Sequence, residues 1–188
     1  MPVWGWILIA VAAVAVIVIV LVIVARQMSA RKQQSSHLRD RFGPEYDRVA
    51  GATGSKRDAE SELTEREERR DQLAVRPLPD ASRERYLEWW RTVQAQFVDD
   101  PKGAIGAADQ LIQSVMAERG YPVEDFEQRA QDLSVDHPDL VQNYRKGHHL
   151  AEASRDNGVS TEDLRQAMTH YKALFVVLVE PESAESRA

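Results

Sequence analysis

The chain of 188 residues has room for one modest domain and accessory segments, because a typical domain takes about 100 to 200 residues. It contains no cysteine, which excludes disulfide bonds, thiolate metal sites and cysteine nucleophiles. Residues 26–76 hold 12 Lys+Arg against 10 Asp+Glu, whereas residues 77–188 hold 12 against 20. Residues 77–188 are therefore acidic and lack the basic face that nucleic-acid binding normally needs, so we expect no nucleic-acid partner.

An uncharged apolar segment opens the chain. Residues 3–25 read VWGWILIAVAAVAVIVIVLVIVA, 23 residues without a charged side chain. As an α-helix at about 1.5 Å per residue this segment reaches about 35 Å, enough to span a hydrocarbon core of about 30 Å. Trp4 and Trp6 stand at one end, where indole rings favour the headgroup level. The sequence therefore predicts a single-pass transmembrane anchor over residues 1–25, with the lipid bilayer as a partner.

The charges beside the anchor predict its direction. No Lys or Arg precedes the apolar run, while Arg26, Arg31, Lys32, Arg39 and Arg41 follow it. A cleaved secretory signal would instead carry a basic segment before an apolar stretch of about 7 to 15 residues. Because basic residues favour the cytoplasmic side of a membrane span, we expect the C-terminal region in the cytoplasm. The alternative is that an uncleaved signal places this region on the exported side.

Two polar segments are expected after the anchor. Residues 26–54 predict a basic juxtamembrane linker with short helices, one of them from Pro44 to about Ala50. Residues 55–76 predict a charged helical stem. Its heptad positions 59, 63, 66, 70 and 73 hold Ala, Leu, Arg, Arg and Leu, and two charged positions in five argue against a strong coiled coil. We expect a solvated stem rather than a dimerisation zipper.

Residues 77–180 predict an all-α bundle of about five helices, with residues 181–188 as a disordered tail. Apolar residues recur at helical spacing, and no stretch alternates long enough for a half-buried strand. The expected helix starts are Asp80 or Ser82, Asp100 before Pro101, a position near Phe126, Asp136, and Ser160, which forms a capping box with Asp163. Gly120 and Pro122 are expected to end the second of these helices.

The chain contains no recognisable catalytic motif. A GxSxG elbow, a GxxxxGK phosphate loop and an HExxH zinc pattern are all missing from the sequence. His148 and His149 would point about 100° apart on a helix, so they cannot chelate one metal ion together. His148 also continues an apolar stripe from Tyr144, which favours a hydrogen-bonded core or boundary histidine. We therefore assign no catalytic residue and no metal ligand, and we expect no cofactor.

The most distinctive stretch is DFEQRAQDLSVDHPDLVQNYR, residues 125–145. It combines aromatic residues with a candidate partner-binding surface of Arg129, Asp132, Asp136, His137 and Arg145. Ion pairs that lock two helices together at this corner are the favoured alternative interpretation of the same residues.

The chain resembles a group of uncharacterised bacterial, notably actinobacterial, membrane-anchored or secreted helical proteins. The matching stretches are LRDRFGPEYDRV, FVDDP, RGYPVEDFEQRAQDLSVDHPDLVQNYR and TEDLRQAMTHYKALF, which cover most of the region after the anchor. The resemblance implies an N-terminal membrane segment followed by a helical domain. It brings no activity and no catalytic residue.

Two hypotheses for the function follow. The first is a membrane-tethered, non-enzymatic interaction module, whose acidic bundle binds basic patches on a protein partner. The second is a helical bundle that binds a small ligand or a metal ion, and this hypothesis includes an enzyme that acts on the ligand. Its cavity would lie among Trp89, Trp90, Tyr144, His148 and Tyr171. The partner's identity and the oligomeric state are not predicted.

Overall fold

The structure, a computed structural model, describes the backbone of residues 3–155 and 158–180, and the side chains of those residues except 3–18, 20, 24, 30 and 31. All regular secondary structure in these ranges is helical, and no strand occurs there. The all-α prediction is therefore confirmed. The predicted tail, residues 181–188, lies outside the described residues.

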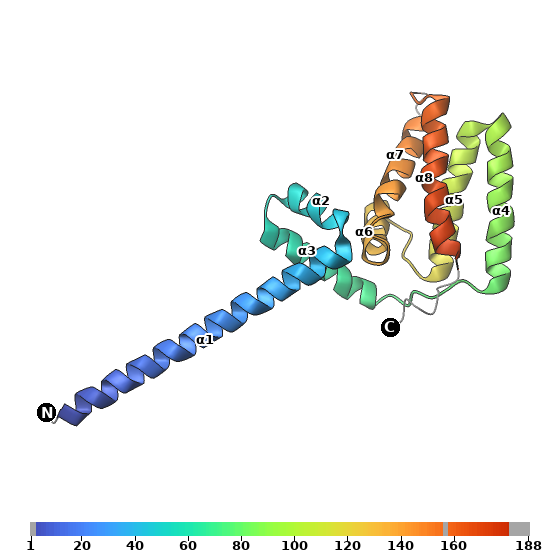
Figure 1. The fold of residues 1–188 in the computed structure, drawn as a ribbon. Helices are drawn as coiled ribbons and strands as arrows, with labels where there is room; N and C mark the ends of the chain where they lie inside the picture. Colours follow the sequence, from blue (N-terminus) through green and yellow to red (C-terminus); the bar gives the residue numbers. More distant parts are fainter. Residues whose placement is uncertain (1–2, 156–157, 181–188) are drawn as a thin grey trace. The chain divides into compact units, whose positions relative to one another are not determined.

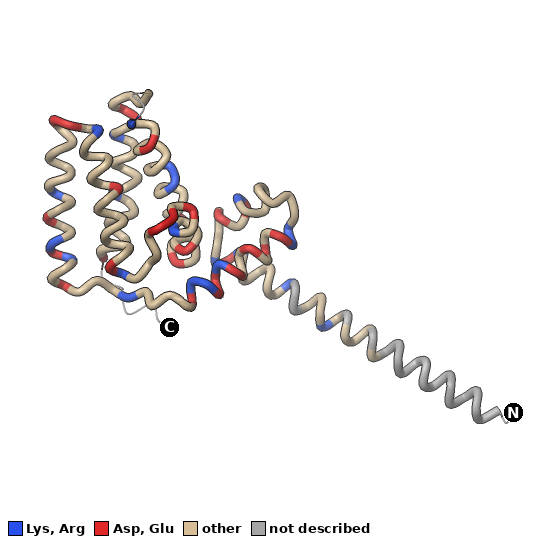
Figure 2. The backbone as a smooth tube through the Cα atoms, turned by 180° about the vertical axis from the view of Figure 1, so that it is seen from behind, with Lys and Arg blue, Asp and Glu red and all other residues tan. Residues whose placement is uncertain are grey.

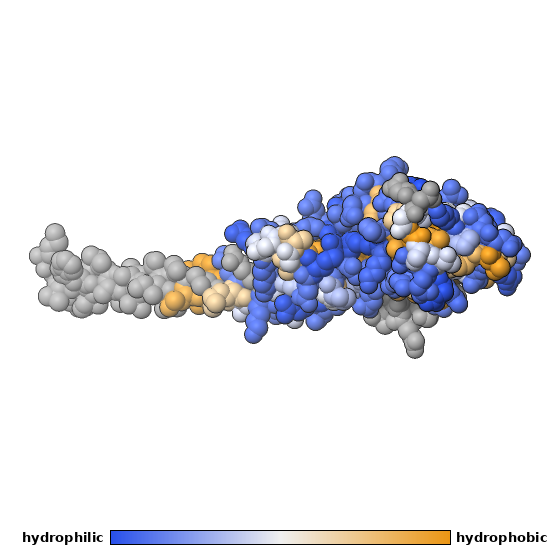
Figure 3. All heavy atoms as spheres, turned by 90° about the horizontal axis from the view of Figure 1, so that it is seen from above, coloured by the Kyte–Doolittle hydropathy of each residue, from blue (hydrophilic) through white to orange (hydrophobic). Residues whose placement is uncertain are grey.

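The chain divides into two compact units, residues 1–41 and residues 42–188. Helix α1, Val3–Phe42, makes up the described part of the first unit (Figure 1). No helix among the described residues is long and apolar enough to cross a membrane. The anchor was predicted over residues 1–25, and the side chains of residues 1–18, 20 and 24 lie outside those described. Ile19, Leu21, Val22 and Ile23 are described and are 48% to 62% exposed. Figure 3 shows apolar side chains on this part of the surface.

The second unit begins with two short helices, α2 (Pro44–Thr53) and α3 (Lys56–Asp71). Pro44 takes the first helical position, where its fixed φ angle suits the turn. Gly54 ends α2 with a φ of 66°, a left-handed conformation that glycine adopts without strain. Ser55 then caps α3 by accepting a hydrogen bond from the backbone N–H of Asp58. The two helices pack side by side (Figure 1).

Five more helices form a bundle: α4 (Asp80–Asp99), α5 (Pro101–Arg119), α6 (Phe126–Asp136), α7 (Val141–Arg155) and α8 (Thr161–Val179). Helices α5 and α8 pack against each other, with α4 and α7 against both of them. The short α6 packs against α7 at one end of the bundle (Figure 1). One connected apolar core runs from Leu78 to Val179, and its aromatic members include Trp90 stacked on Phe175 at a centroid distance of 4.8 Å.

Local sequence signals set several helix ends as expected. Asp100 caps α5 by accepting a hydrogen bond from the N–H of Gly103 at 2.9 Å. Ser160 and Asp163 form the predicted capping box of α8. Gly120 ends α5 in the left-handed conformation, with a φ of 98°. These three predictions are confirmed.

Two predicted helix starts differ from the structure. Asp80 is the first residue of α4, and Pro79 stands in the N-cap position. Asp136 is the last residue of α6, whereas the next helix begins at Val141. The carboxylate of Asp136 accepts a hydrogen bond from Arg70 of α3, so it makes a tertiary contact in place of a cap.

Helix α3 is present where a stem was predicted, but it is not solvated on all sides. Ala59, Leu63 and Arg66 are at most 2% exposed, and the helix packs against α2 and α6. These residues occupy three of the five heptad positions that the sequence singled out. The heptad face of α3 is therefore buried against other helices of the same compact unit, whereas the sequence predicted a solvated stem.

Candidate functional site

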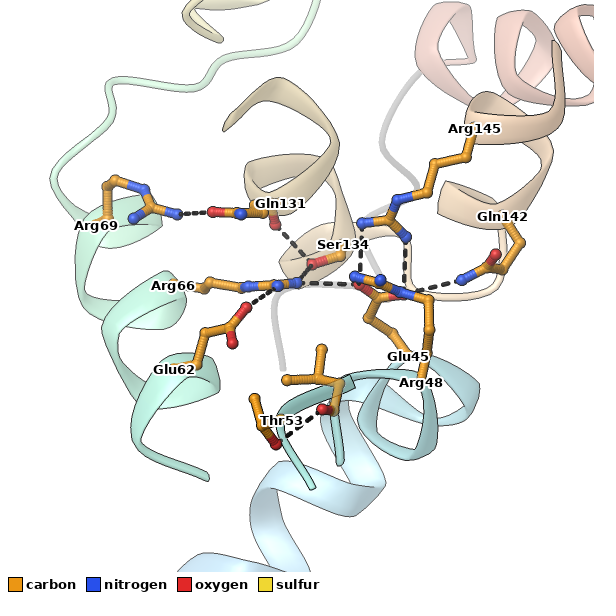
Figure 4. A network of polar contacts seen from close by, with 11 residues as sticks. Glu45, Arg48, Thr53, Glu62, Arg66, Arg69, Gln131, Ser134, Gln142 and Arg145 are labelled. Carbon is orange, nitrogen blue, oxygen red and sulfur yellow. Dashed lines mark hydrogen bonds and ion pairs between the residues drawn. The ribbon is translucent and has the colours of Figure 1, made fainter. Parts of the chain in front are cut away.

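The most concentrated set of polar contacts surrounds Glu45, in the first turn of α2 (Figure 4). Its carboxylate has no exposed surface, and it accepts hydrogen bonds from side chains on three helices. Arg66 of α3 donates through Nη1 at 3.0 Å. Arg145 of α7 donates through Nη1 at 2.9 Å and Nη2 at 3.1 Å, and Gln142 adds a contact of 3.0 Å. Arg48, one turn along α2, donates through Nε at 2.8 Å and Nη2 at 2.7 Å.

The charges in this cluster favour an ionised carboxylate. Burial by itself would raise the pKa of Glu45, but the hydrogen bonds and charges of Arg48 and Arg145 outweigh burial and lower the pKa to about 2. Arg66 also pairs with Glu62, one turn earlier on α3. Three guanidinium groups thus meet two carboxylates. The Nε atoms of Arg66 and Arg145 are buried without a hydrogen-bond partner among the described residues.

Two more ion pairs continue the cluster along α3 and α6. Arg69 Nε lies 3.0 Å from Asp132 Oδ1, and Arg69 Nη2 donates to Gln131 at 3.0 Å. Arg70 Nε lies 2.5 Å from Asp136 Oδ2. Figure 2 shows how densely acidic and basic residues follow each other along α3. Charged side chains of α3 therefore bind α6 at several points.

The residues predicted as a partner-binding surface lie in or beside this cluster. Asp132, Asp136 and Arg145 each contact α3 or α2, as described above. Arg129 is 3% exposed, and its Nε donates to the hydroxyl of Tyr144 at 2.6 Å. His137 is half-buried at the end of α6. Asp132, Asp136 and Arg145 therefore form ion pairs, but with α3 and α2 rather than with each other. The role of the five residues in partner binding stays a prediction.

A groove of about 630 Å³ lies over α6, α7 and α8, and it shares Arg145 with the cluster around Glu45. Its lining includes Phe126 and His148, whose rings stack at a centroid distance of 3.7 Å. Burial lowers the pKa of His170 at its edge, and the charge of Lys146 acts in the same direction. The other residues that line the groove are Glu127, Arg145, His149, Leu150, Glu152 and Gln166.

His148 connects the groove to a buried carboxylate in the bundle. Its Nδ1 lies 3.5 Å from Asp109 Oδ1, without hydrogen-bonding geometry, and its Nε2 lies 3.6 Å from Glu152. Asp109 accepts hydrogen bonds from Tyr171 at 2.9 Å and Gln113 at 2.7 Å. Burial would raise the pKa of Asp109, but the imidazole of His148 and these two donors lower it. The side chain of His148 is 15% exposed, which agrees with the boundary position predicted from the sequence.

The groove is not at the cavity expected among Trp89, Trp90, Tyr144, His148 and Tyr171. Of these residues only His148 lines it. Tyr144 and Tyr171 have no exposed surface, because they fill the core. Nor do the described residues include a cluster of three or more His, Cys, Asp or Glu side chains that could hold a metal ion.

Sequence reasoning missed Glu45 and Arg66 as members of a site. Glu45 follows Pro44 in a first helical turn, where a carboxylate is ordinary because it suits the helix dipole. Arg66 did carry a signal, since it and Arg70 are charged residues on a heptad face whose other three positions are apolar. A charged residue on such a face indicates that its partner lies on a neighbouring helix.

No known protein family, no curated protein and no solved structure matches this chain. The resemblance to membrane-anchored or secreted bacterial proteins therefore stays an expectation.

Proposed function

We propose that the chain is a non-enzymatic interaction module tethered to a membrane by its N-terminal helix. One observation carries the tether: residues 3–25 contain no charged side chain and open a helix of 40 residues. In addition, Ile19, Leu21, Val22 and Ile23 expose at least 48% of their surface, which is unfavourable in water and favourable in lipid. The basic residues that follow favour a cytoplasmic C-terminal region.

Membrane fractionation of the C-terminally tagged full chain tests the tether. We expect the uncleaved chain to sediment with membranes, to resist a high-salt wash and to dissolve in detergent. Replacing Val14 and Val18 together by Lys is expected to move the chain toward the soluble fraction, since each charge at the centre of a span costs about 3 kcal/mol. The matched control replaces both residues by Leu. Recovery of the uncleaved native chain in the soluble fraction, without detergent, would contradict the tether.

Protease access in intact cells tests the orientation. A tag at the C-terminus is expected to be protected until the membrane is opened, because it lies in the cytoplasm. Cleavage of the tag in intact cells would place the C-terminal region on the exported side.

The interaction role rests on the acidic charge of residues 77–188, with 20 Asp+Glu against 12 Lys+Arg. We expect chemical cross-linking in cells, followed by purification in detergent, to capture a protein with a basic surface. The complex should weaken as salt rises, because screening reduces the attraction between exposed charges. If cross-linking and purification both yield no specific partner, the interaction role is wrong.

A small-ligand function is the second candidate, because the groove of about 630 Å³ falls within the size range of ligand sites, about 300 to 1,000 Å³. A bound ligand raises thermal stability. In a thermal-shift screen of metabolites and metal ions, a groove ligand should lose its effect when the exposed groove residues Lys146 and His149 are replaced by Ala. A screen without any stabilising compound would remove this candidate.

A further inference from the structure

The second unit holds buried apolar residues that lie outside the connected core of the bundle. The connected core of the bundle runs from Leu78 to Val179. The buried apolar residues of α2 and α3, which are Tyr46, Val49, Ala59 and Leu63, do not belong to it. They are at most 1% exposed, and Phe42 just before α2 and Val135 of α6 are also buried apolar residues outside that core.

Charged and polar contacts join α2 and α3 to α6 and α7. On one side stand Glu45, Arg66, Arg69 and Arg70 of α2 and α3; on the other stand Gln131, Asp132, Ser134, Asp136, Gln142 and Arg145 of α6 and α7. Ion pairs of this kind lose most of their attraction to the cost of desolvation, so they contribute little net stability. They nevertheless fix orientation, because one unpaired buried charge is strongly unfavourable.

The segment after α3 is attached to the bundle, so a hinge for α2 and α3 lies at the end of α3. The segment from Leu73 to Leu78 stays with the bundle: the N–H of Arg76 donates to the carbonyl of Arg119 at 2.9 Å, and Leu73 and Val75 pack against the bundle core. Residues 71–72, at the end of α3, are therefore the point at which α3 can move while the following segment holds its position.

We propose that α2 and α3 form one docked element that is held to the bundle by charge and leaves it while the bundle stays folded. In the docked state this element covers Asp132, Asp136 and Arg145; in the undocked state it exposes them. The two interpretations of these residues, an ion-pair lock and a partner-binding surface, then describe the closed and open states of one surface. The undocking stands apart from the proposed function, whereas its use to control partner binding rests on that function.

Native-state hydrogen exchange of the full chain in detergent micelles tests the undocking. We expect the amides of α2 and α3 to exchange through an opening that leaves α5 and α8 protected. Glu45→Gln removes one of the two carboxylates of the cluster, so the three arginines keep Glu62 as their one acidic partner in the cluster. Buried charge without a partner destabilises the docked state, and the population of the open state should rise on the order of 100-fold. Glu162→Gln on α8 is the matched control, because the Glu162–Arg165 pair lies on the surface and should leave the exchange of α2 and α3 unchanged.

Carbodiimide labelling gives a second readout of the same opening. Labelling of Asp132 and Asp136 is expected to rise in Glu45→Gln and to stay at the native level in Glu162→Gln. One shared opening for α2, α3, α5 and α8 in the native chain would overturn the proposal, as would unchanged exchange in Glu45→Gln. A chain that undocks but captures no partner would leave the undocking intact and remove only its link to the proposed function.

Discussion

The carboxylate of Glu45 stays ionised in the interior because four side chains donate hydrogen bonds to it. A buried acid without such donors would take up a proton, since burial disfavours the charged form. Here the pKa is lowered to about 2 from an ordinary value of 4.5. The folded state therefore binds this proton more weakly than the unfolded chain does.

This difference predicts how acid affects stability. Above pH 4.5 the ionised carboxylate stabilises the folded chain by roughly 3 kcal/mol relative to the protonated acid, and this difference is lost as the pH falls through about 2. Denaturant unfolding of the native chain and of Glu45→Gln should therefore show a difference that shrinks over this window. A difference that stays constant down to pH 2 would show that the carboxylate is not held ionised by its neighbours.

At the scale of elements, the sequence predicted those helix ends that neighbouring residues determine. Asp100 before Pro101, Ser160 with Asp163, and Gly120 each act within one turn of chain, so no knowledge of the tertiary fold was needed. The burial of α3 could not be predicted in this way. Its charged side chains pair with residues 21 to 68 positions away, which only the folded chain brings together.

The end of α5 offers a test of such a local signal. Gly120 has a φ of 98°, and a Cβ atom there would lie 2.7 Å from the carbonyl oxygen of Ala74. Gly120→Ala should therefore lower the free energy of unfolding by roughly 2 kcal/mol or more. Gly106→Ala, in the same helix, is the control: its Cβ meets no atom within 4 Å, and alanine should raise stability by up to about 1 kcal/mol. Equal effects at the two positions in denaturant unfolding would contradict this explanation.

Across the whole second unit, apolar residues form the core of the bundle, and charged residues hold α2 and α3 against it. The core from Leu78 to Val179 accounts for the bundle, and apolar periodicity was enough to predict it. The docking of α2 and α3 depends on matched charges, and periodicity does not report which charges will meet. For this reason the sequence predicted the bundle but assigned α3 to a solvated stem, and left the ion pairs of Asp132 and Asp136 as one of two alternatives.

Three tyrosines buried across this unit predict how it unfolds in alkali. Burial raises the pKa of Tyr144 to about 12. The pKa values of Tyr121 and Tyr171 are raised further, because burial acts together with the negative charge of Asp136 on Tyr121 and of Asp109 on Tyr171. The folded chain thus holds these protons more tightly than the unfolded chain, whose tyrosines titrate near 10. Stability is fully present below pH 10 and is lost as the pH rises toward the pKa values of the folded chain.

We therefore expect the absorbance of tyrosinate from these residues to appear together with the loss of the helical circular-dichroism signal, in one step above pH 10. Tyr144→Phe should make the alkaline loss of stability less steep, because one of the three groups is gone. It should also lower stability at neutral pH by about 1 to 3 kcal/mol, because the buried Arg129 loses a hydrogen-bond acceptor. Full ionisation of all tyrosines near pH 10, with the helical signal intact, would show that the three hydroxyl groups are accessible to water in the folded chain.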